Sequence, residues 1–290
     1  MAHRDRHRPP RIGASGRLKQ QPRSTSRDRA GAPRKSLGQH FLTDRNLLGA
    51  IADAAGVGPG DTVIEVGPGR GALTEVLAAR AARVIALELD EALAGALRDA
   101  MPPNVTVVHA DARQAEPSVL LDGCRAYKLA GNLPYYAAMP ILRRFLEGEC
   151  PPTHAAVLVQ REVAQEMCAR PGDMSLLSLA VQIRATARVV RLVRPGAFNP
   201  PPKVTSAVVA LEVRGKPVDG IDDPDAFFVL ARAAFSARRK QLRNALSQGL
   251  GIPGADADAL LRSAGIEQSR RAETLSWPEW VALYRAWRAR

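Results

Sequence analysis

A four-residue motif, Asn132-Leu133-Pro134-Tyr135, combines groups that can activate an exocyclic amine of a nucleic-acid base for methyl transfer. The lone pair of such an amine is delocalised into the ring, so the nitrogen is a poor nucleophile. The side-chain oxygen of Asn132 and the carbonyl oxygen of Leu133 can accept its two hydrogens and draw the nitrogen toward a pyramidal geometry. Pro134 stiffens the loop, and the ring of Tyr135 offers a face on which a flipped-out base can stack.

A glycine-rich turn, Gly67-Pro-Gly69-Arg-Gly71, precedes this motif in the chain. Alone, the four-residue motif is typical of a turn that ends a buried strand, and the glycine turn also fits the relaxed dinucleotide fingerprint of nicotinamide enzymes. The backbone amides of such a turn can approach a polar ligand closely. Because this turn is followed by Asn-Leu-Pro-Tyr rather than by a nicotinamide site, S-adenosylmethionine is the better cofactor. Glu88, at the end of a predicted strand, is placed to bind ribose hydroxyls, and Asp111 to bind the adenine amino group.

The elements that must position these residues follow an α/β alternation. Buried strands alternate with helices of about ten residues, which indicates right-handed crossovers and a mostly parallel sheet with helices on both faces. We expect about seven strands in a Rossmann-like sheet. The predicted strands are 62–66, 83–89, 105–109, 126–130, 154–160, 189–193 and 204–213, and the predicted helices of this part are 72–80, 91–100 and one capped by Thr43 or Asp44.

A small helical domain is predicted at the C-terminus. Residues 215–224 are rich in Gly, Pro and Asp and are typical of a linker. Beyond it we expect helices at 226–250, 256–264 and 277–288, with Ser276 capping the last. The predicted domain boundaries are therefore 1–35 for a tail, 36–214 for the catalytic domain and 215–290 for the helical domain.

The net charge of +12 is concentrated in that tail. Residues 1–35 hold eleven Lys and Arg against two acids, and the remaining 255 residues carry a net charge of only +3. The tail has almost no large aliphatic residues, so we expect it to be disordered and to contact nucleic acid. An organelle transit peptide is the alternative interpretation, which the prolines and the lack of an apolar face disfavour.

The remaining composition excludes several classes of protein. No segment is apolar enough for a membrane span and no secretory signal is present, so we expect a cytoplasmic protein. Cys124, Cys150 and Cys168 are far apart and lack a C-x-x-C spacing. This pattern disfavours a metal site and a disulfide scaffold, and predicts three reduced cysteines that pack in the interior.

Five motifs give the chain a resemblance to a known family. They are Leu-Gly-Gln-His-Phe-Leu (37–42), Glu-Val-Gly-Pro-Gly-Arg-Gly-Ala-Leu-Thr (65–74), Leu-Glu-Leu-Asp (87–90), Ala-Asp-Ala (110–112) and Gly-Asn-Leu-Pro-Tyr (131–135). From about Lys35 to Arg288 the chain resembles the ribosomal RNA adenine dimethyltransferases. That family includes a small-subunit enzyme and large-subunit macrolide-resistance enzymes.

The resemblance implies a class I methyltransferase fold and a set of site residues. The implied cofactor contacts, to which the glycine turn adds Gly69, are His40, Leu42, Gly67, Glu88, Asp111 and Asn132. Phe198, in a segment similar to the loop after the family's catalytic motif, should form a second aromatic wall opposite Tyr135. The chain departs from the commoner family pattern at His40 and Tyr136, where Asn is frequent.

Basic residues late in the chain indicate rRNA contacts. Lys203 lies in the Phe198 segment, and Arg238, Arg239, Lys240 and Arg243 fall in the predicted helix 226–250. By charge alone these would form a solvated helix face, but their order is similar to a segment shared by the family, and they would bind phosphates without reading sequence.

Together these segments favour the small-subunit branch of the family. That branch implies dimethylation of two adjacent adenosines in the 3′-terminal stem-loop of 16S rRNA, within the small subunit or its precursor, by a monomer. A resistance-type enzyme acting on 23S rRNA and an assembly factor whose methylation is dispensable remain as alternatives.

Overall fold

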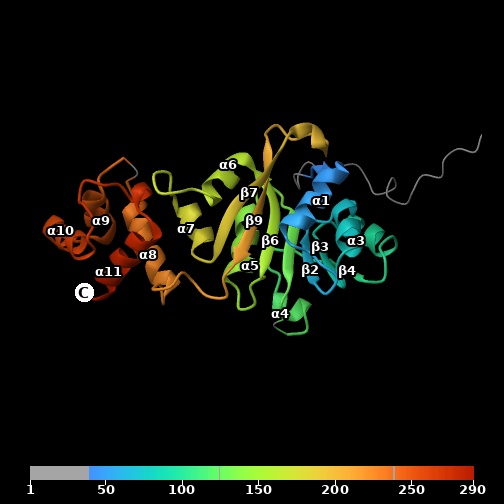
Figure 1. The fold of residues 1–290 in the computed structure, drawn as a ribbon, viewed down its shortest axis with the longest axis horizontal. Coiled ribbons are helices and arrows are strands. Elements are labelled where there is room, and N and C mark those ends of the chain that lie inside the picture. Colours follow the sequence, from blue (N-terminus) through green and yellow to red (C-terminus); the bar gives the residue numbers. More distant parts are fainter. Residues whose placement is uncertain (1–38, 124, 238) are drawn as a thin grey trace, which may run out of the picture.

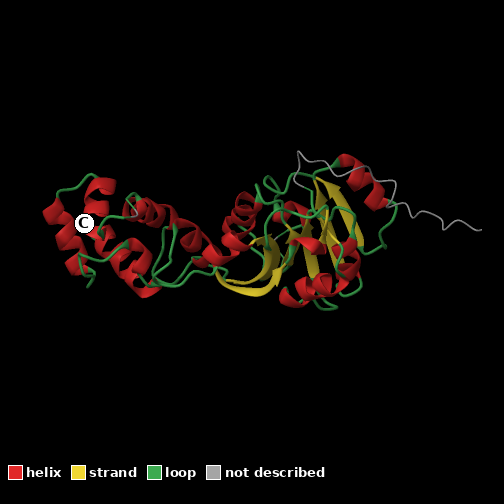
Figure 2. Ribbon diagram, turned by 90° about the horizontal axis from the view of Figure 1, so that it is seen from above, coloured by secondary structure: helices red, strands yellow, loops and turns green. Residues whose placement is uncertain are grey.

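The computed structural model describes residues 39–123, 125–237 and 239–290. The predicted tail of residues 1–35, Cys124 and Arg238 lie outside these residues. Figure 1 shows a sheet with helices on both sides and, at one end of the molecule, a separate group of helices. Figure 2 shows the same elongated arrangement from above, with the strands confined to one part of the molecule.

Seven strands form one sheet in the order β4-β3-β2-β5-β6-β9-β7. The first five strands in this order are parallel, whereas β9 runs antiparallel to both β6 and β7. The chain order reverses between β2 and β5, and ligands of such sheets bind outside the carboxyl ends of the strands at this switch point. The strands are β2 (Thr62–Val66), β3 (Arg83–Glu88), β4 (Val105–His109), β5 (Lys128–Asn132), β6 (His154–Gln160), β7 (Ala185–Val193) and β9 (Ser206–Val213).

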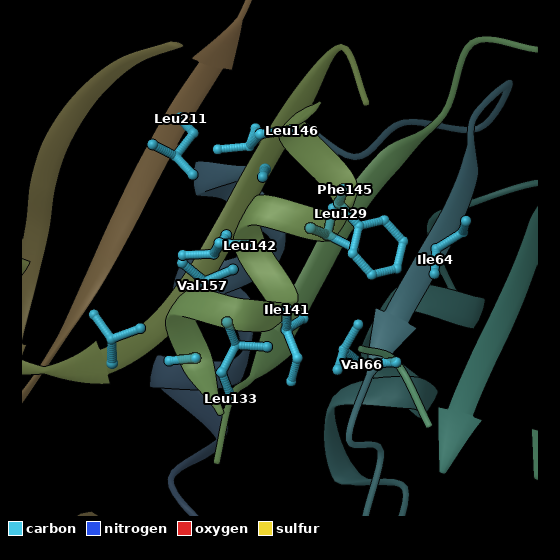
Figure 3. Packing of buried hydrophobic residues seen from close by; sticks show 14 of the residues in the cluster. Ile64, Val66, Leu129, Leu133, Ile141, Leu142, Phe145, Leu146, Val157 and Leu211 are labelled. Carbon is cyan, nitrogen blue, oxygen red and sulfur yellow. The ribbon is translucent and has the colours of Figure 1, made fainter. Parts of the chain in front are cut away.

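Helices cover both faces because successive side chains of each strand point to opposite sides. On β2, Val63 packs with helices α1 and α2, whereas Ile64 and Val66 pack with α5. Figure 3 shows α5 lying over the sheet, with Phe145 beside Leu129 and Ile64. The helices of this part are α1 (Arg45–Ala54), α2 (Ala72–Ala78), α3 (Glu91–Arg98), α4 (Pro117–Leu120), α5 (Ala138–Glu147), α6 (Arg161–Met167) and α7 (Leu176–Gln182).

A two-stranded ribbon lies beside the main sheet and was not predicted from the sequence. Strand β1 (Phe41–Leu42) pairs antiparallel with β8 (Phe198–Asn199), which follows the short 3₁₀ helix η3 (Pro195–Ala197). The backbone N–H and the hydroxyl of Thr43 both donate to the carbonyl of Ala197, and this extends the pairing. The ribbon thus brings residues 39–42 to the carboxyl edge of the main sheet.

The C-terminal helices surround their own hydrophobic cluster, in which Phe227, Trp280 and Tyr284 are buried. Met174, Leu179 and other residues near α7 complete this cluster, so the helices are packed onto the sheet region through α7. The helices are α8 (Pro224–Phe235), α9 (Leu242–Leu250), α10 (Gly254–Ser263), the 3₁₀ helix η4 (Ala272–Thr274) and α11 (Trp277–Arg288).

The prediction of one continuous helix over 226–250 is wrong. The chain leaves the helix after Phe235 and re-enters one at Leu242, so that α9 turns back onto α8. Gly249 lies so close to the backbone of Ala233 that an added Cβ would stand 2.5 Å from its Cα. The predicted cap of α11 is confirmed, because the carboxylate of Glu279 accepts the backbone N–H of Ser276.

Two further expectations concern the cysteines and the membrane. Cys150 takes part in a disulfide, so the prediction of three reduced cysteines is wrong for this residue, whereas Cys168 is a free thiol. No helix among the described residues is long and apolar enough to cross a membrane.

Candidate active site at the carboxyl edge of the sheet

A pocket opens at the switch point, outside the carboxyl ends of β2, β3, β4 and β5. Its volume is about 820 Å³ when the space at its open mouth is included. Nearly all the residues proposed from the sequence for cofactor binding and base activation line it: His40, Gly67, Gly69, Glu88, Asp111, Asn132, Leu133, Pro134 and Tyr135. Residues that are far apart in the chain thus converge on one cavity.

The glycine turn and Glu88 form one wall. Glu88 is buried, and its carboxylate accepts backbone N–H groups from Gly69 at 3.0 Å and Asp90 at 2.9 Å. Burial raises the pKa of Glu88, although these two hydrogen bonds oppose the rise. Gly69 has a φ of +57°, and a Cβ there would lie 2.9 Å from the ring of Phe41. The carboxylate and the turn are therefore held together before any ligand arrives.

Glu65 is an acid that the sequence motifs contain but to which the sequence analysis gave no role. It lines a smaller hollow that shares Gly67, Gly69 and Asn132 with the main pocket. Burial raises the pKa of Glu65 to about 8, and the nearby charge of Glu88 adds to the rise. Within the described structure, its Oε2 atom is buried without a hydrogen-bond partner, as are Arg70 Nε and Thr74 Oγ1. Unpaired buried polar atoms are rare, and two of these, on Glu65 and Arg70, belong to residues that line the hollow.

Asn132 is the last residue of β5 and its side chain is oriented by the N-terminal segment. Its Nδ2 donates to the carbonyl of His40 at 2.8 Å. A carbonyl only accepts, so the contact turns the Oδ1 atom away as a free acceptor. Among the described residues no donor reaches this Oδ1 or the carbonyl of Leu133. The two acceptors that the sequence predicted are both available.

Tyr135 is fixed at both ends of its side chain. Its hydroxyl lies 2.6 Å from Ser206 Oγ, and its ring stacks on His40 with centroids 6.0 Å apart. Burial raises the pKa of the Tyr135 hydroxyl, so it stays protonated. The next residue, Tyr136, lines the same pocket but is 57% exposed, which leaves its ring open to solvent. The position where the chain departs from the commoner Asn thus supplies an accessible aromatic face.

Phe198 does not line the pocket in this structure. The ring is 4% exposed and lies in the hydrophobic cluster beneath α1. The ring that stacks on Tyr135 is that of His40, and the role of Phe198 as a second wall for a bound base stays a prediction. Leu42, its partner across the β1–β8 ribbon, is also buried and lines only the smaller hollow.

Asp111 lies in the pocket, but its carboxylate is already engaged. Arg113 donates to both oxygens through its side chain, at distances from 2.6 to 3.0 Å, and its backbone N–H adds a fourth bond. The hydrogen bonds from Arg113 lower the pKa of Asp111. An adenine amino group can reach this carboxylate only if the half-exposed Arg113 side chain moves.

The basic residues predicted to bind RNA lie in different settings. Arg239 and Lys240 are exposed in the turn between α8 and α9 rather than on a helix, and Lys203 is exposed in the loop before β9. Arg243 is on α9, where its Nε donates to Asp258 at 2.8 Å. This pair neutralises the charge and leaves Arg243 less suited to a phosphate.

Comparison with known proteins agrees with this site. The profile of the family "Ribosomal RNA adenine dimethylase" matches residues 31–287. "Ribosomal RNA small subunit methyltransferase A" of Dehalococcoides mccartyi is 49% identical over 253 residues, which cover 86% of this chain and 87% of the relative. The protein of the same description from Geobacter metallireducens is 43% identical over 260 residues, covering 87% and 94%.

Two solved structures share the fold over most of the chain. The 23S rRNA methyltransferase ErmE superposes with a TM-score of 0.69 at 28% identity, covering 85% of this chain and 98% of its own. A dimethyladenosine transferase from Plasmodium falciparum gives a TM-score of 0.71 at 23% identity, covering 84% and 96%.

Proposed function

This chain belongs to the ribosomal RNA adenine dimethylase family, and on that basis we propose that it dimethylates two adjacent adenosines in the 3′-terminal stem-loop of 16S rRNA. It is an S-adenosylmethionine-dependent rRNA adenine dimethyltransferase. The observation that carries the proposal is the pair of free acceptors, Asn132 Oδ1 and the Leu133 carbonyl, at the edge of a pocket built for a nucleoside.

The residues at the pocket fit S-adenosylmethionine. The buried carboxylate of Glu88 lies beside the glycine turn, in which Gly69 has no room for a Cβ. A ribose held by such a carboxylate needs a turn whose backbone amides can come close to it. The unpaired Glu65 Oε2 offers an acceptor for a charged group such as the ammonium of the donor's methionine end. We propose that Gly67, Gly69 and Glu88 hold the adenosine part of the donor.

When bound, S-adenosylmethionine supplies a methyl group that the positive charge of its sulfonium activates for transfer. The acceptors at Asn132 and Leu133 hold the adenine amino group and stabilise the positive charge that develops on its nitrogen. His40 contributes by fixing the Asn132 amide. The stacked His40 and Tyr135 rings hold this edge of the pocket in place, so positioning supplies most of the rate enhancement and no strong base is needed.

The exposed ring of Tyr136 gives the target base a surface on which to stack at the pocket mouth. We further propose that the sheet domain, predicted from the sequence to span residues 36–214, carries the chemistry. The helices from residue 215 onward, with the exposed Arg239 and Lys240, bind rRNA backbone. The enzyme acts as a cytoplasmic monomer on the small subunit or its precursor.

Methylation of isolated ribosomal subunits tests this function. Small and large subunits that lack the modification are incubated with the full chain and labelled S-adenosylmethionine, and the labelled nucleotides are mapped by mass spectrometry. We expect dimethyladenosine in adjacent positions of 16S rRNA only. Label in 23S rRNA would instead assign the chain to the resistance branch.

A second measurement addresses the assembly-factor alternative. Cells that lack the enzyme are complemented with the wild type or with Asn132→Ala, and the maturation of small subunits is followed. Full maturation with the inactive variant would show that binding, rather than methylation, is the contribution to assembly.

A further inference from the structure

Strand β7 forms an exposed edge of the sheet and is covered on one face only. It pairs with β9 alone, so its other side ends the sheet. Helices α6 and α7 contact β7, whereas α1, which lies over the opposite face, contacts β5, β6 and β9. Apart from Val193 at its end, which packs in the cluster under α1, the α1-side face of β7 is bare of helices in the described structure. In Figure 1, α6 and α7 lie beside β7.

The register of β7 places two arginines on this bare face. Arg188 pairs with Ala210 and Arg191 pairs with Val208, with a β-bulge between Val189 and Arg191. Val208 packs in the cluster under α1, and Ala210 is two residues away on the same side of β9. Without the bulge, two residues three apart in the sequence would point to opposite faces. The extra residue brings both guanidinium groups to one side.

The side chains of these arginines are exposed to solvent. The side chains of Arg188, Arg191 and the following Arg194 form no hydrogen bond or ion pair with any other described residue. The acids on the same side are Glu212, which lies on β9 opposite Thr186, and Asp44. The carboxylate of Asp44 accepts the N–H groups of Asn46 and Leu47 at the start of α1. Positive charge therefore predominates on this face.

The basic strand leads into the active site. Its last residue, Val193, pairs with Ser206, the residue whose hydroxyl bonds to Tyr135. Arg191 and Arg194 line a shallow groove with Thr43 and Ala197, next to the ribbon that carries Phe41 into the pocket. Arg188 and Arg191 are separated by two residue steps of β9, about 7 Å, a spacing comparable with that of neighbouring phosphates on one RNA strand.

We propose that Arg188 and Arg191 on the α1-side face of β7, together with Arg194 just beyond the end of the strand, form an RNA-docking surface that binds the phosphates of the substrate strand leading to the target adenosine. The proposal rests on the proposed function, because it assumes an RNA substrate at the same pocket. Charged residues on an edge strand also prevent aggregation, but that role needs no common face and no continuity with the active site.

The test compares charge changes at matched sites in the full chain. The first variant is R188E/R191E, the second is R188Q/R191Q, and the control is R125E, which changes an exposed arginine before β5 at the opposite, amino edge of the sheet. Methylation of unmodified small subunits is measured across a salt series, with S-adenosylmethionine binding and thermal unfolding measured in parallel.

We expect KM for the subunit to rise at least tenfold in the glutamate pair and several-fold in the glutamine pair, with kcat at saturating subunit within about threefold of the wild type. The slope of log KM against log salt should decrease by up to about two, one for each lost phosphate contact. R125E should behave as the wild type does. Binding of S-adenosylmethionine should not change in any variant.

An unchanged KM and salt slope in both arginine pairs overturns the proposal. If the glutamate pair fails to fold, the glutamine pair decides, because it removes charge without adding repulsion. If the wild type itself does not methylate small subunits, the proposed function fails instead. In that case binding of a labelled single-stranded RNA to the same variants still decides whether β7 binds RNA.

Discussion

The carboxyl edge of the sheet and the C-terminal helices treat their polar groups in opposite ways. Among the C-terminal helices, charges neutralise one another, as in the pairs Arg243–Asp258 and Arg270–Glu279. At the pocket, Glu65 Oε2 is buried unpaired and Asn132 Oδ1 is turned toward open space. Apart from Trp280 Nε1, which is also buried without a partner in the described structure, the C-terminal helices pair such groups internally, whereas the pocket leaves Glu65 Oε2 and Asn132 Oδ1 open to a ligand.

The largest expected effect follows from removing a prepared acceptor. Asn132→Ala should lower kcat by about two to three orders of magnitude, by analogy with the loss of one hydrogen bond that strengthens in the transition state. Single-turnover methylation at saturating cofactor measures this loss. The matched control is Asn104→Ala, whose side chain donates only to the carbonyls of Ala78 and Ala81. That variant should lose stability but keep its activity per folded molecule.

The contributions of Glu65, beside the pocket, and Glu279, in the C-terminal helices, to the free energy of unfolding should respond to pH in opposite ways. Burial raises the pKa of Glu65 to about 8, so the folded protein holds this proton more tightly than the unfolded chain does. Its contribution to stability is full below the unfolded pKa near 4.5 and is lost as pH rises toward 8. Glu65→Gln should remove this loss, which has a slope of roughly 1.4 kcal/mol per pH unit at most.

The hydrogen bond from Arg270 lowers the pKa of Glu279 to about 2. Its contribution is therefore present above pH 4.5 and is lost as pH falls toward 2, and Glu279→Gln should destabilise at neutral pH. Urea unfolding of both variants and the wild type at pH 3, 5 and 8.5 measures the two effects. Parallel pH profiles for the two variants would contradict the contrast between site and scaffold.

Substitutions of two aromatic residues, Tyr136 and Phe198, should also affect different properties, the first base binding and the second stability. Tyr136→Ala should weaken engagement of the target adenosine by about 1 to 3 kcal/mol, the value of one base stacked on an aromatic ring. Phe198→Ala should instead lower the thermal stability and leave kcat/KM per folded molecule near that of the wild type. A large loss of kcat/KM in folded Phe198→Ala would restore this ring to the base-binding wall predicted from the sequence.

The smallest effect concerns Asp111. Because Arg113 must release part of this carboxylate before an adenine amino group can bind, Arg113→Ala should tighten S-adenosylmethionine binding a few-fold, in keeping with the low energy of an exposed ion pair. Calorimetric titration measures the change. Weaker binding in Arg113→Ala would mean that the arginine holds Asp111 in its binding orientation, and Asp111→Asn should weaken binding in either case.

The sequence predicted those elements whose pattern is local. Thr62–Val66 and Val105–His109 have the predicted bounds because each is a short, largely apolar run between turn residues, although only the first is largely buried. The strand predicted at 126–130 lies at Lys128–Asn132 instead, so Asn132 ends the strand itself. Most of the pocket was predicted for the same reason, since its residues follow successive strands and must meet at one edge.

What the sequence did not predict depends on contacts between distant segments. Nothing in residues 236–241 breaks a helix locally, and the break arises because Gly249 packs against Ala233. The burial of Phe198 follows from the pairing of β8 with β1, two strands of two residues each that carry no periodic signal. The bulge in β7 is likewise invisible in composition, since it depends on the register with β9.

The β1–β8 ribbon also sets the order in which the walls of the pocket form while the chain is synthesised. His40 forms part of the pocket, yet its ring is held by the carbonyl of Pro200, 160 positions later in the chain. Proteins are synthesised from the N-terminus, so the glycine turn and Asn132 leave the ribosome well before Pro200, the residue that holds the His40 ring in the opposite wall of the pocket. The pocket therefore closes only after Pro200 has been synthesised, and the ability to hold its methyl donor marks a chain whose catalytic half is complete.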